Sequence, residues 1–263
     1  MGHPIRIFLA FVFLFLLLFA CAFQKISYLP TTRYINERAK RETFVRLNAD
    51  FSKTVVIDSN AMPWEDSPMA GVQRRKLDRI GEEVARATSL VKYAPKSYFS
   101  PHTHGGGEEI FVIDGVFSDE HGDYPAGTYI RNPIGTTHKP HSEDGCVIFV
   151  KLHQFDAQDT KQFTINTNEA DFLPGSAPGL TVLPLHSFEG ESCALVRWAP
   201  GTKFNPHKHW GGEEIFVLEG TFSDENGDYP AGTWLRSPHL SQHHPFSKEG
   251  CLIFVKTGHL PDQ

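Results

Sequence analysis

The sequence predicts an all-β protein made of two similar β-barrels, because three observations agree. Residues 94–151 align without gaps with residues 199–256 at an offset of 105. About 36 of the aligned positions are identical, which indicates an internal duplication. Within each copy, short β-branched or aromatic runs alternate with Gly, Pro and Asp, as strands alternate with turns. Two copies of this size fit two jelly rolls better than one large sheet.

Each copy contains three runs that we expect to be strands. The last run of each copy is apolar on both faces, so it should lie between two packed layers. The runs are residues 108–113, 127–131 and 146–150 in the first copy, and 213–218, 232–236 and 251–255 in the second.

A weaker match upstream sets the expected domain boundaries. Residues 56–60 resemble residues 164–168 at an offset of 108. We therefore expect one barrel over residues 45–155 and the other over residues 156–260. Residues 24–44 are interpreted as a solvated linker or a short helix.

The N-terminus carries an apolar run from Ile7 to Phe23, after a short start that contains Arg6. This pattern is typical of a signal peptide or a short membrane anchor, so residues 1–23 are left out of the fold. Three outcomes stay open: cleavage after Ala22, lipidation of Cys21, or an uncleaved span. We expect an exported or membrane-anchored protein, with the periplasmic side favoured.

Composition narrows the functional classes. A net charge of −6 and a pI near 6.1 do not suit nucleic-acid binding. The four cysteines form no CxxC pair, which argues against a disulfide scaffold and a thiolate zinc site. A small-molecule ligand or substrate is the expected partner, and a homo-oligomer is compatible with the composition. The unusual feature is the 14 histidines, of which six recur at matched spacings.

The recurring histidines predict one metal site in each copy. His102 and His104 are separated by one residue, so both rings point to the same side of an extended strand. The glycines that follow permit a sharp turn that returns Glu108 to the two rings. A distant strand then supplies His138. The second copy repeats this set as His207, His209, Glu213 and His243.

One alternative concerns the carboxylate ligand. Glu109 or Glu214 could replace Glu108 or Glu213, because a slip of one residue presents the opposite face of a strand. The spacing to the next glycine favours the first glutamate of each pair.

Other polar features receive structural interpretations. The acidic segments 118–123 and 223–228 lack the spacing of calcium loops and are expected to be hairpin turns. Cys146 and Cys251 are expected to be small buried residues. Four side chains could face a ligand, although a structural role is favoured: Arg131, Arg236, Tyr129 and Trp234.

The two copies resemble the cupin superfamily, whose motifs run from HxHxxxE to a glycine and then GxxxxxPxGxxH. The first copy fills the second motif with Gly127, Pro133, Gly135 and His138. The second copy has Leu240 where a glycine is expected. The string HTHGGGEEIFVIDGVFSDEHGDYPAGTYIRNP is similar to the cupin domain of ChrR-type anti-sigma factors and their free-standing relatives.

This resemblance implies a bicupin, with two tandem jelly rolls of the double-stranded β-helix type over most of residues 47–256. Some relatives are dioxygenases that cleave carbon–carbon bonds in small diketones or hydroxyacetophenones. The anti-sigma proteins carry a further helical domain that binds the sigma factor. The sequence lacks that domain, so sigma-factor binding is not expected.

Three imidazoles and one carboxylate suit one divalent transition metal per barrel, and iron, manganese and zinc fit best. A six-coordinate ion keeps two positions for substrate and dioxygen, so the metal centre itself would be catalytic. Four-coordinate zinc has a closed shell and is structural or sensory. The first hypothesis is therefore a non-haem metal-dependent, oxygenase-like enzyme that acts on a small oxygenated compound. The alternative is a non-catalytic zinc cupin that serves as a sensor or ligand-binding module.

Overall fold

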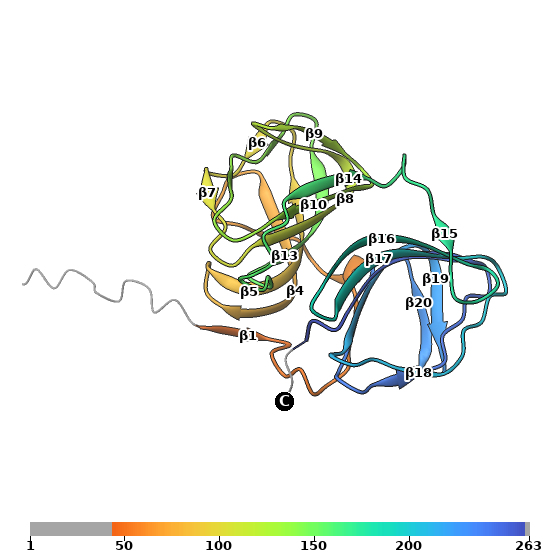
Figure 1. The fold of residues 1–263 in the computed structure, drawn as a ribbon. Coiled ribbons are helices and arrows are strands. Elements are labelled where there is room, and N and C mark those ends of the chain that lie inside the picture. Colours follow the sequence, from red (N-terminus) through yellow and green to blue (C-terminus); the bar gives the residue numbers. More distant parts are fainter. Residues whose placement is uncertain (1–43, 261–263) are drawn as a thin grey trace, which may run out of the picture. The chain divides into compact units, whose positions relative to one another are not determined.

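The computed structural model describes residues 44–260, which form two jelly-roll barrels of antiparallel strands (Figure 1). The expected all-β class is confirmed, and the only helix in this range is one short 3₁₀ turn, η1 (Ser59–Ala61). No helix among these residues has the length and apolarity needed to cross a membrane. The expected signal or anchor segment 1–23 lies outside the described residues, as does residue range 24–43 of the expected linker.

The first barrel has a main sheet in the order β1-β4-β5-β13-β8-β10-β14. The three runs expected to be strands in the first copy fall in β8, β10 and β13. The bounds are β1 Val45–Leu47, β3 Glu65–Asp66, β4 Val72–Gly81, β5 Ala85–Tyr93, β6 Ser97–Tyr98, β7 His102–Thr103, β8 Glu108–Asp119, β9 Gly122–Pro125, β10 Thr128–Asn132, β11 Thr137–His138, β12 His141–Ser142, β13 Cys146–Leu152 and β14 Phe163–Asn166.

The second barrel repeats this arrangement with the order β15-β16-β17-β23-β19-β21-β2. Its three expected strands fall in β19, β21 and β23. The bounds are β2 Val55–Asp58, β15 Leu173–Pro174, β16 Leu180–Phe188, β17 Glu191–Trp198, β18 His207–Lys208, β19 Glu213–Asp224, β20 Gly227–Pro230, β21 Thr233–Ser237, β22 Gln242–His243 and β23 Cys251–Thr257.

The two repeats exchange a strand. β2, at the start of the first repeat, pairs with β21 of the second barrel, and β14, at the start of the second repeat, pairs with β10 of the first. The residues that follow the exchanged strands make matching contacts. Ser59 Oγ donates a hydrogen bond to the Gly232 carbonyl at 2.6 Å, and Thr167 Oγ1 donates one to the Gly127 carbonyl at 2.6 Å. The upstream match in the sequence therefore marks two strands that link the barrels.

Three apolar clusters explain why the strands are apolar on both faces. One cluster lies inside the first barrel, one lies inside the second, and the third joins residues of both. In the third cluster the ring of Phe149 stacks on that of Phe216 at 5.0 Å. β13 therefore turns Ile148 and Val150 into its own barrel and Phe149 toward the other barrel. This arrangement confirms the expected position of residues 146–150 between packed layers.

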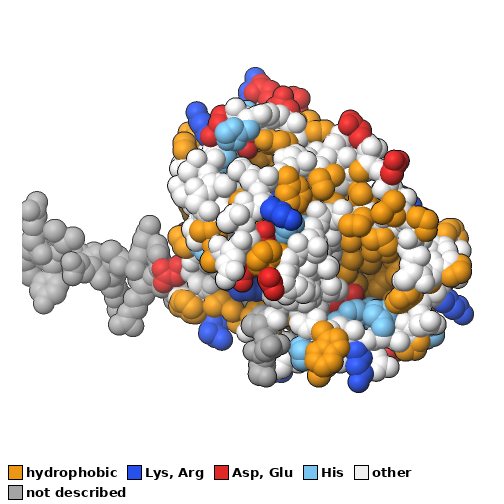
Figure 2. All heavy atoms as spheres, in the orientation of Figure 1, with side chains coloured by type: hydrophobic (Ala, Val, Ile, Leu, Met, Phe, Trp, Pro, Cys, Tyr) orange, Lys and Arg blue, Asp and Glu red, His pale blue; other side chains and the backbone are white. Residues whose placement is uncertain are grey.

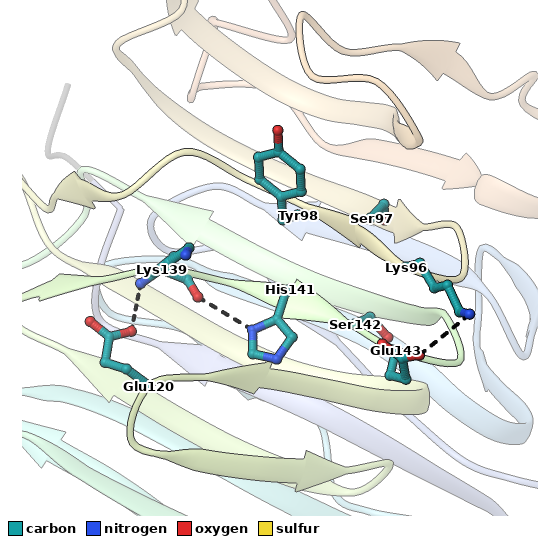
Figure 3. A pocket seen from close by; sticks show the side chains of 8 residues that line it. All are labelled: Lys96, Ser97, Tyr98, Glu120, Lys139, His141, Ser142 and Glu143. Carbon is teal, nitrogen blue, oxygen red and sulfur yellow. Dashed lines mark hydrogen bonds and ion pairs between the residues drawn. The ribbon is translucent and has the colours of Figure 1, made fainter.

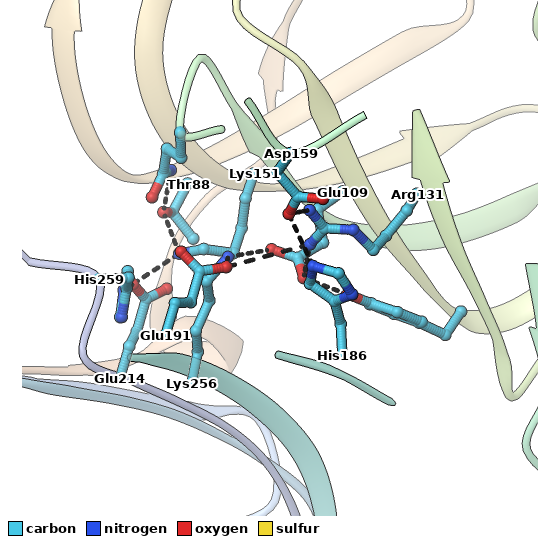
Figure 4. A network of polar contacts seen from close by, with 12 residues as sticks. Thr88, Glu109, Arg131, Lys151, Asp159, His186, Glu191, Glu214, Lys256 and His259 are labelled. Atoms are coloured by element: carbon cyan, nitrogen blue, oxygen red, sulfur yellow. Dashed lines mark hydrogen bonds and ion pairs between the residues drawn. The ribbon is translucent and has the colours of Figure 1, made fainter. Parts of the chain in front are cut away.

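Buried charges connect the two barrels around the same apolar cluster (Figure 4). Lys256 Nζ lies 2.7 Å from the carboxylate of Glu109 in the first barrel and 2.7 Å from that of Glu191 in its own. In the equivalent contact, Lys151 Nζ lies 2.6 Å from the carboxylate of Glu214 in the second barrel. The duplication thus produces two related ion pairs, each with one partner in each barrel.

Two buried arginines at equivalent positions extend this network. Arg131 donates to the carboxylate of Asp159, and Arg236 Nη1 donates to that of Asp78 at 2.9 Å. Both arginines therefore have a structural role between the barrels, which the sequence favoured. Tyr129 and Trp234 donate to the same glutamates that the lysines contact.

The two ion pairs differ because Glu191 corresponds to Arg86 in the other repeat. Burial opposes the charged form of Lys256, but Glu109 and Glu191 outweigh it and raise the pKa of this lysine. Burial lowers the pKa of Lys151, although Glu214 acts in the opposite direction. Lys256 is therefore the better compensated of the two buried lysines.

Outside the network, several ion pairs lie at the surface, such as that of Lys248 with Asp228 at 3.2 Å. On the face drawn in Figure 2, basic and acidic side chains are interspersed among uncharged ones. This face of the described residues therefore presents no continuous basic surface.

Removal of one partner of the better-compensated pair should destabilise the protein strongly. We expect Lys256→Met to lower the free energy of unfolding by about 3–5 kcal/mol, because it removes the lysine from the buried carboxylate of Glu109 and the partly buried one of Glu191. Lys151→Met is the matched variant, and its loss should be smaller because only one carboxylate is left without its lysine. Urea denaturation of both variants measures the difference. An equal or larger loss for Lys151→Met would contradict this reading of the interface.

Candidate metal centres

The structure gathers the four expected ligands of the first repeat at one end of the barrel. His102 lies on β7 and His138 on β11, and the two strands pair so that these residues are directly opposite. His104 follows β7, and Glu108 is the first residue of β8. One ligand atom of each residue lies within 4.8 Å of those of the other three.

The second repeat gathers its four expected ligands in the same way. His207 on β18 pairs with His243 on β22, and Glu213 begins β19. With His209, these residues again offer one ligand atom each within 4.8 Å of one another. The structure therefore brings all eight predicted residues together in two clusters of three histidines and one glutamate.

Glycines before β8 and β19 make the turn that returns the glutamate to the rings. Gly107 and Gly212 have φ of 77° and 71°, values that side chains with a Cβ rarely adopt. A Cβ on Gly107 would also lie 2.3 Å from the Phe155 ring. The expected function of the glycines is thus observed, and here it is a requirement of both backbone and packing.

The alternative glutamates do not face the clusters. Glu109 accepts from Tyr129 and pairs with Lys256, and Glu214 accepts from Trp234 and pairs with Lys151. The alternation of the strand places them on the outer face of their own barrel. They belong to the contacts between the barrels.

The ring nitrogens fit a bound cation. Four buried Nε2 atoms lie 3.1–3.7 Å from the glutamate of their own cluster and have no other partner in the described residues. Buried polar atoms of this kind need a compensating contact. In the third histidine of each cluster, Nδ1 is held from outside, since His102 Nδ1 lies 2.8 Å from the Ser100 carbonyl and His207 Nδ1 lies 2.9 Å from the Asn205 carbonyl. This leaves the Nε2 lone pairs directed at the centre, as metal ligation requires. The four atoms belong to His104, His138, His209 and His243.

The family model described as ChrR Cupin-like domain matches residues 52–156 and again residues 160–261, which together make up well over half of the chain. The chain belongs to the ChrR cupin-like family. The predicted resemblance and the two tandem cupin barrels are confirmed. No curated protein matches the chain.

Several solved structures share the two-cupin fold. A proposed dioxygenase from Nostoc punctiforme PCC 73102 is 16% identical, with a TM-score of 0.66 and coverage of 78% of this chain and 82% of that one. Protein YlbA from E. coli is 13% identical, with a TM-score of 0.64 and coverage of 87% and 99%. Oxalate decarboxylase from Bacillus subtilis is 13% identical, with a TM-score of 0.54 and coverage of 77% and 75%. At these identities the likeness shows the fold.

The ligands of the first cupin site have more hydrogen bonds to residues outside the cluster than the ligands of the second site have. Thr136 Oγ1 lies 2.8 Å from His104 Nδ1, and Asn132 Nδ2 donates to Glu108 at 3.3 Å. The equivalent positions hold Ser241, whose hydroxyl is buried without a partner in the described residues, and Ser237. Because contacts of this kind orient ligands and tune metal affinity, the first site is the better organised of the two.

An aspartate from the acidic hairpin turn supports each site, and the sequence analysis missed this role. The segments 118–123 and 223–228 form the expected turns between β8 and β9 and between β19 and β20. In addition, Asp119 lies 3.4 Å from His138 Nδ1, and Asp224 lies 3.7 Å from His243 Nδ1. The signal was available in the sequence, since both repeats keep this aspartate.

The two ligand glutamates have opposite pKa shifts. Burial raises the pKa of Glu213 to about 7, and the charge of His243 only partly opposes it. Burial acts on Glu108 in the same direction, but a hydrogen bond with His104 and the charge of His138 lower its pKa to about 2. The closer contact between His104 Nε2 and Glu108, at 3.1 Å against 3.5 Å between His209 and Glu213, accounts for part of the difference.

Metal affinity at the second site should therefore depend more steeply on pH. Glu213 must lose a proton before it can bind a cation, whereas Glu108 is already ionised. Below its pKa of about 7, this proton should cost the second site up to about tenfold more affinity per pH unit than the first.

Zinc titrations from pH 7.5 to 5.5 test this, in variants that keep one site each. His207→Ala with His209→Ala leaves the first site, and His102→Ala with His104→Ala leaves the second. Parallel pH dependence at the two sites would rule out the assigned difference between the glutamates.

Leu240 replaces the motif glycine without displacing the loop that delivers His243. It takes φ of 61°, and the equivalent Gly135 takes 90°. Leu240 N donates to the His209 carbonyl at 2.8 Å, just as Gly135 N donates to the His104 carbonyl at 2.9 Å. The second site thus keeps the cupin loop at the expense of a strained leucine.

A glycine at this position should relieve the strain. We expect Leu240→Gly to raise the free energy of unfolding by about 1 kcal/mol, because the left-handed conformation costs leucine energy that glycine avoids. Gly135→Leu is the reciprocal variant and should destabilise by a similar amount, since a Cβ there meets no atom within 4 Å. Thermal denaturation measures both, and a destabilising Leu240→Gly would show that side-chain packing outweighs the strain.

A cavity of about 310 Å³ adjoins the first site and is lined by all four of its ligands. Its other walls are mainly apolar, with aromatic and aliphatic side chains from several strands. This is the usual composition of a small-molecule pocket, in which a few polar groups orient a ligand among apolar walls. The apolar lining includes Val91, Phe99, Phe117, Ile148 and Leu152.

Proposed function

We propose that the protein is a non-haem metal-dependent, oxygenase-like enzyme that acts on a small oxygenated compound in the first barrel. The observation that carries this proposal is the cavity at the ligands of that site. A metal with a purely structural role would have no need of a ligand-sized space beside it.

The ligand geometry suits this chemistry. His102 and His138 lie on β7 and β11, His104 follows β7, and Glu108 begins β8, all at one end of the barrel. These four residues would hold a divalent cation, which would supply the means to bring an oxygenated substrate and dioxygen together.

The protein residues have separate parts in such a reaction. Glu108, ionised in its buried position, would offset part of the charge of a cation held by the three histidines. The outer contacts of the rings, such as that between His104 and Thr136, hold the ring orientations. The apolar walls exclude water from the reacting end of the substrate.

The solved neighbours support the same class of function. Their names include a proposed dioxygenase and an oxalate decarboxylase. The competing proposal is a non-catalytic zinc site, which has a closed tetrahedral shell. The cavity beside the first site favours the enzyme.

Oxygen uptake tests the proposed function. The protein is loaded with Fe(II) without air and then mixed with oxygen and a panel of β-diketones and hydroxyacetophenones. We expect uptake with at least one compound, and we expect it to be abolished by His102→Ala with His104→Ala but kept by His207→Ala with His209→Ala. Fully loaded protein that is silent across the panel would contradict the proposal.

A further inference from the structure

We propose that the first-barrel cavity takes a small organic carboxylate, whose anionic end is bound by Arg79. The inference rests on the proposed function because it concerns the same site. It does not require that the protein turn the ligand over. It depends on a buried arginine that the metal ligation does not use. Arg79 lines the same cavity as His102, His104 and Glu108.

Arg79 lies on the interior side of β4. It is paired with Ala87 of β5 and is only 4% exposed. Its Nη2 donates to the backbone carbonyls of Glu82 and Glu83, which fix the guanidinium against the turn between β4 and β5. Within residues 44–260, Arg79 forms no ion pair with a carboxylate and no hydrogen bond from its Nε or Nη1. The remaining donors are therefore available to a ligand.

The neighbouring charges do not neutralise Arg79. Arg74 lines the same cavity and forms a two-point contact with Glu83, at 3.1 and 3.2 Å. That pair engages the nearest carboxylate, so Glu83 is not an ion-pair partner of Arg79. Burial and the charge of Arg74 lower the pKa of Arg79, against a smaller opposing effect of Glu83. An arginine in this position is destabilised by its surroundings, and an anion would reverse that effect.

The second barrel lacks this charge, which provides a comparison within one chain. Val182 pairs with Val196 as Arg74 pairs with Val91, and Ser187 pairs with Ser192 as Arg79 pairs with Ala87. Both barrels therefore have the metal ligands, but β16 carries no arginine at the positions of Arg74 and Arg79. A positive charge here is not required by the cupin fold.

A second, more open pocket at the surface provides a contrast, because its charged side chains already have partners within the protein (Figure 3). There Lys96 pairs with Glu143 at 3.9 Å, and the carboxylate of Glu120 accepts from the backbone nitrogen of Lys139 at 2.7 Å. The charged groups Lys96, Glu143 and Glu120 thus already have partners, one an ion pair and the other a backbone amide. The cavity with Arg79 combines a buried cation, apolar walls and a metal-ligand set.

These features define the ligand class. The apolar walls suit a short hydrocarbon body, and the volume of about 310 Å³ suits a compact molecule. One end of the ligand carries oxygens that can bind a metal ion, and a carboxylate pairs with the guanidinium. Arginine favours such a group because its donors match the two oxygens of a carboxylate.

Binding of a matched acid and ester tests the inference. The probes are 2,4-dioxopentanoate and its methyl ester, which keep the same metal-binding diketone and differ in the charged carboxylate. Cobalt-loaded protein is used, with the second site removed by His207→Ala and His209→Ala, and affinity is followed by calorimetry and by the visible spectrum of the cobalt. We expect the acid to bind at least about tenfold more tightly than the ester.

Variants of two arginines on β4 test whether Arg79 is the source of the preference for the acid over the ester. Arg79→Gln should remove most of the preference for the acid and leave binding of the ester within about twofold. Arg79→Lys, which keeps the charge, should retain part of it. Arg75→Gln is the control, because this arginine lies over the Trp64 ring at 4.2 Å and does not line the cavity. It should leave the preference unchanged.

The results separate this inference from the proposed function. Equal binding of acid and ester by the parent protein, or an undiminished preference in Arg79→Gln, would overturn the inference. Neither result depends on oxygen uptake. If the protein prefers the acid but turns over no compound, only the proposal of enzymatic activity is overturned. If it turns over neutral diketones but does not prefer the acid, only the proposal of carboxylate binding is overturned.

Discussion

A β-strand turns successive side chains to opposite faces, and two adjacent glutamates in each repeat depend on this alternation. Glu108 faces the interior of its barrel and joins three histidines, while Glu109 faces outward and pairs with Lys256 of the other barrel. Glu213 and Glu214 divide in the same way. A shift of β8 by one residue would put the wrong glutamate in both places. One strand register therefore fixes both the metal cluster and the contact between the barrels.

The two repeats are nearly identical in their metal ligands and in the contacts between the barrels. They differ in the residues around the cavity of the first barrel. Both repeats keep the ligands, the ion pair between barrels and the exchanged strand. The first barrel alone combines a fully supported ligand set with interior arginines, and the second substitutes Ser187 for Arg79 and Leu240 for a motif glycine. This pattern is the one expected if the first site acts on a ligand while the second site maintains its barrel.

The sequence could predict the fold and the eight clustered residues because motif spacing encodes them locally. His102 and His104 share a face by strand periodicity, and the glycines before Glu108 announce the turn. The roles of Lys256 and Glu109 could not be predicted in this way, because their contact spans 147 residues and depends on how the barrels pack. The position of Arg79 at the cavity could not be predicted for a related reason. It lies outside the gapless alignment, so its absence from the second repeat becomes visible only through the pairing of β4 and β16 with their neighbours.

The most direct test of the central claim is elemental analysis of the natively expressed protein, purified without chelators. Two clusters that each hold one cation predict two transition-metal ions per chain. They also predict one ion per chain when either pair of closely spaced histidines, His102 with His104 or His207 with His209, is replaced by alanine. Folded protein that carries no transition metal, or variants that retain both ions, would contradict the assignment of these clusters as metal sites.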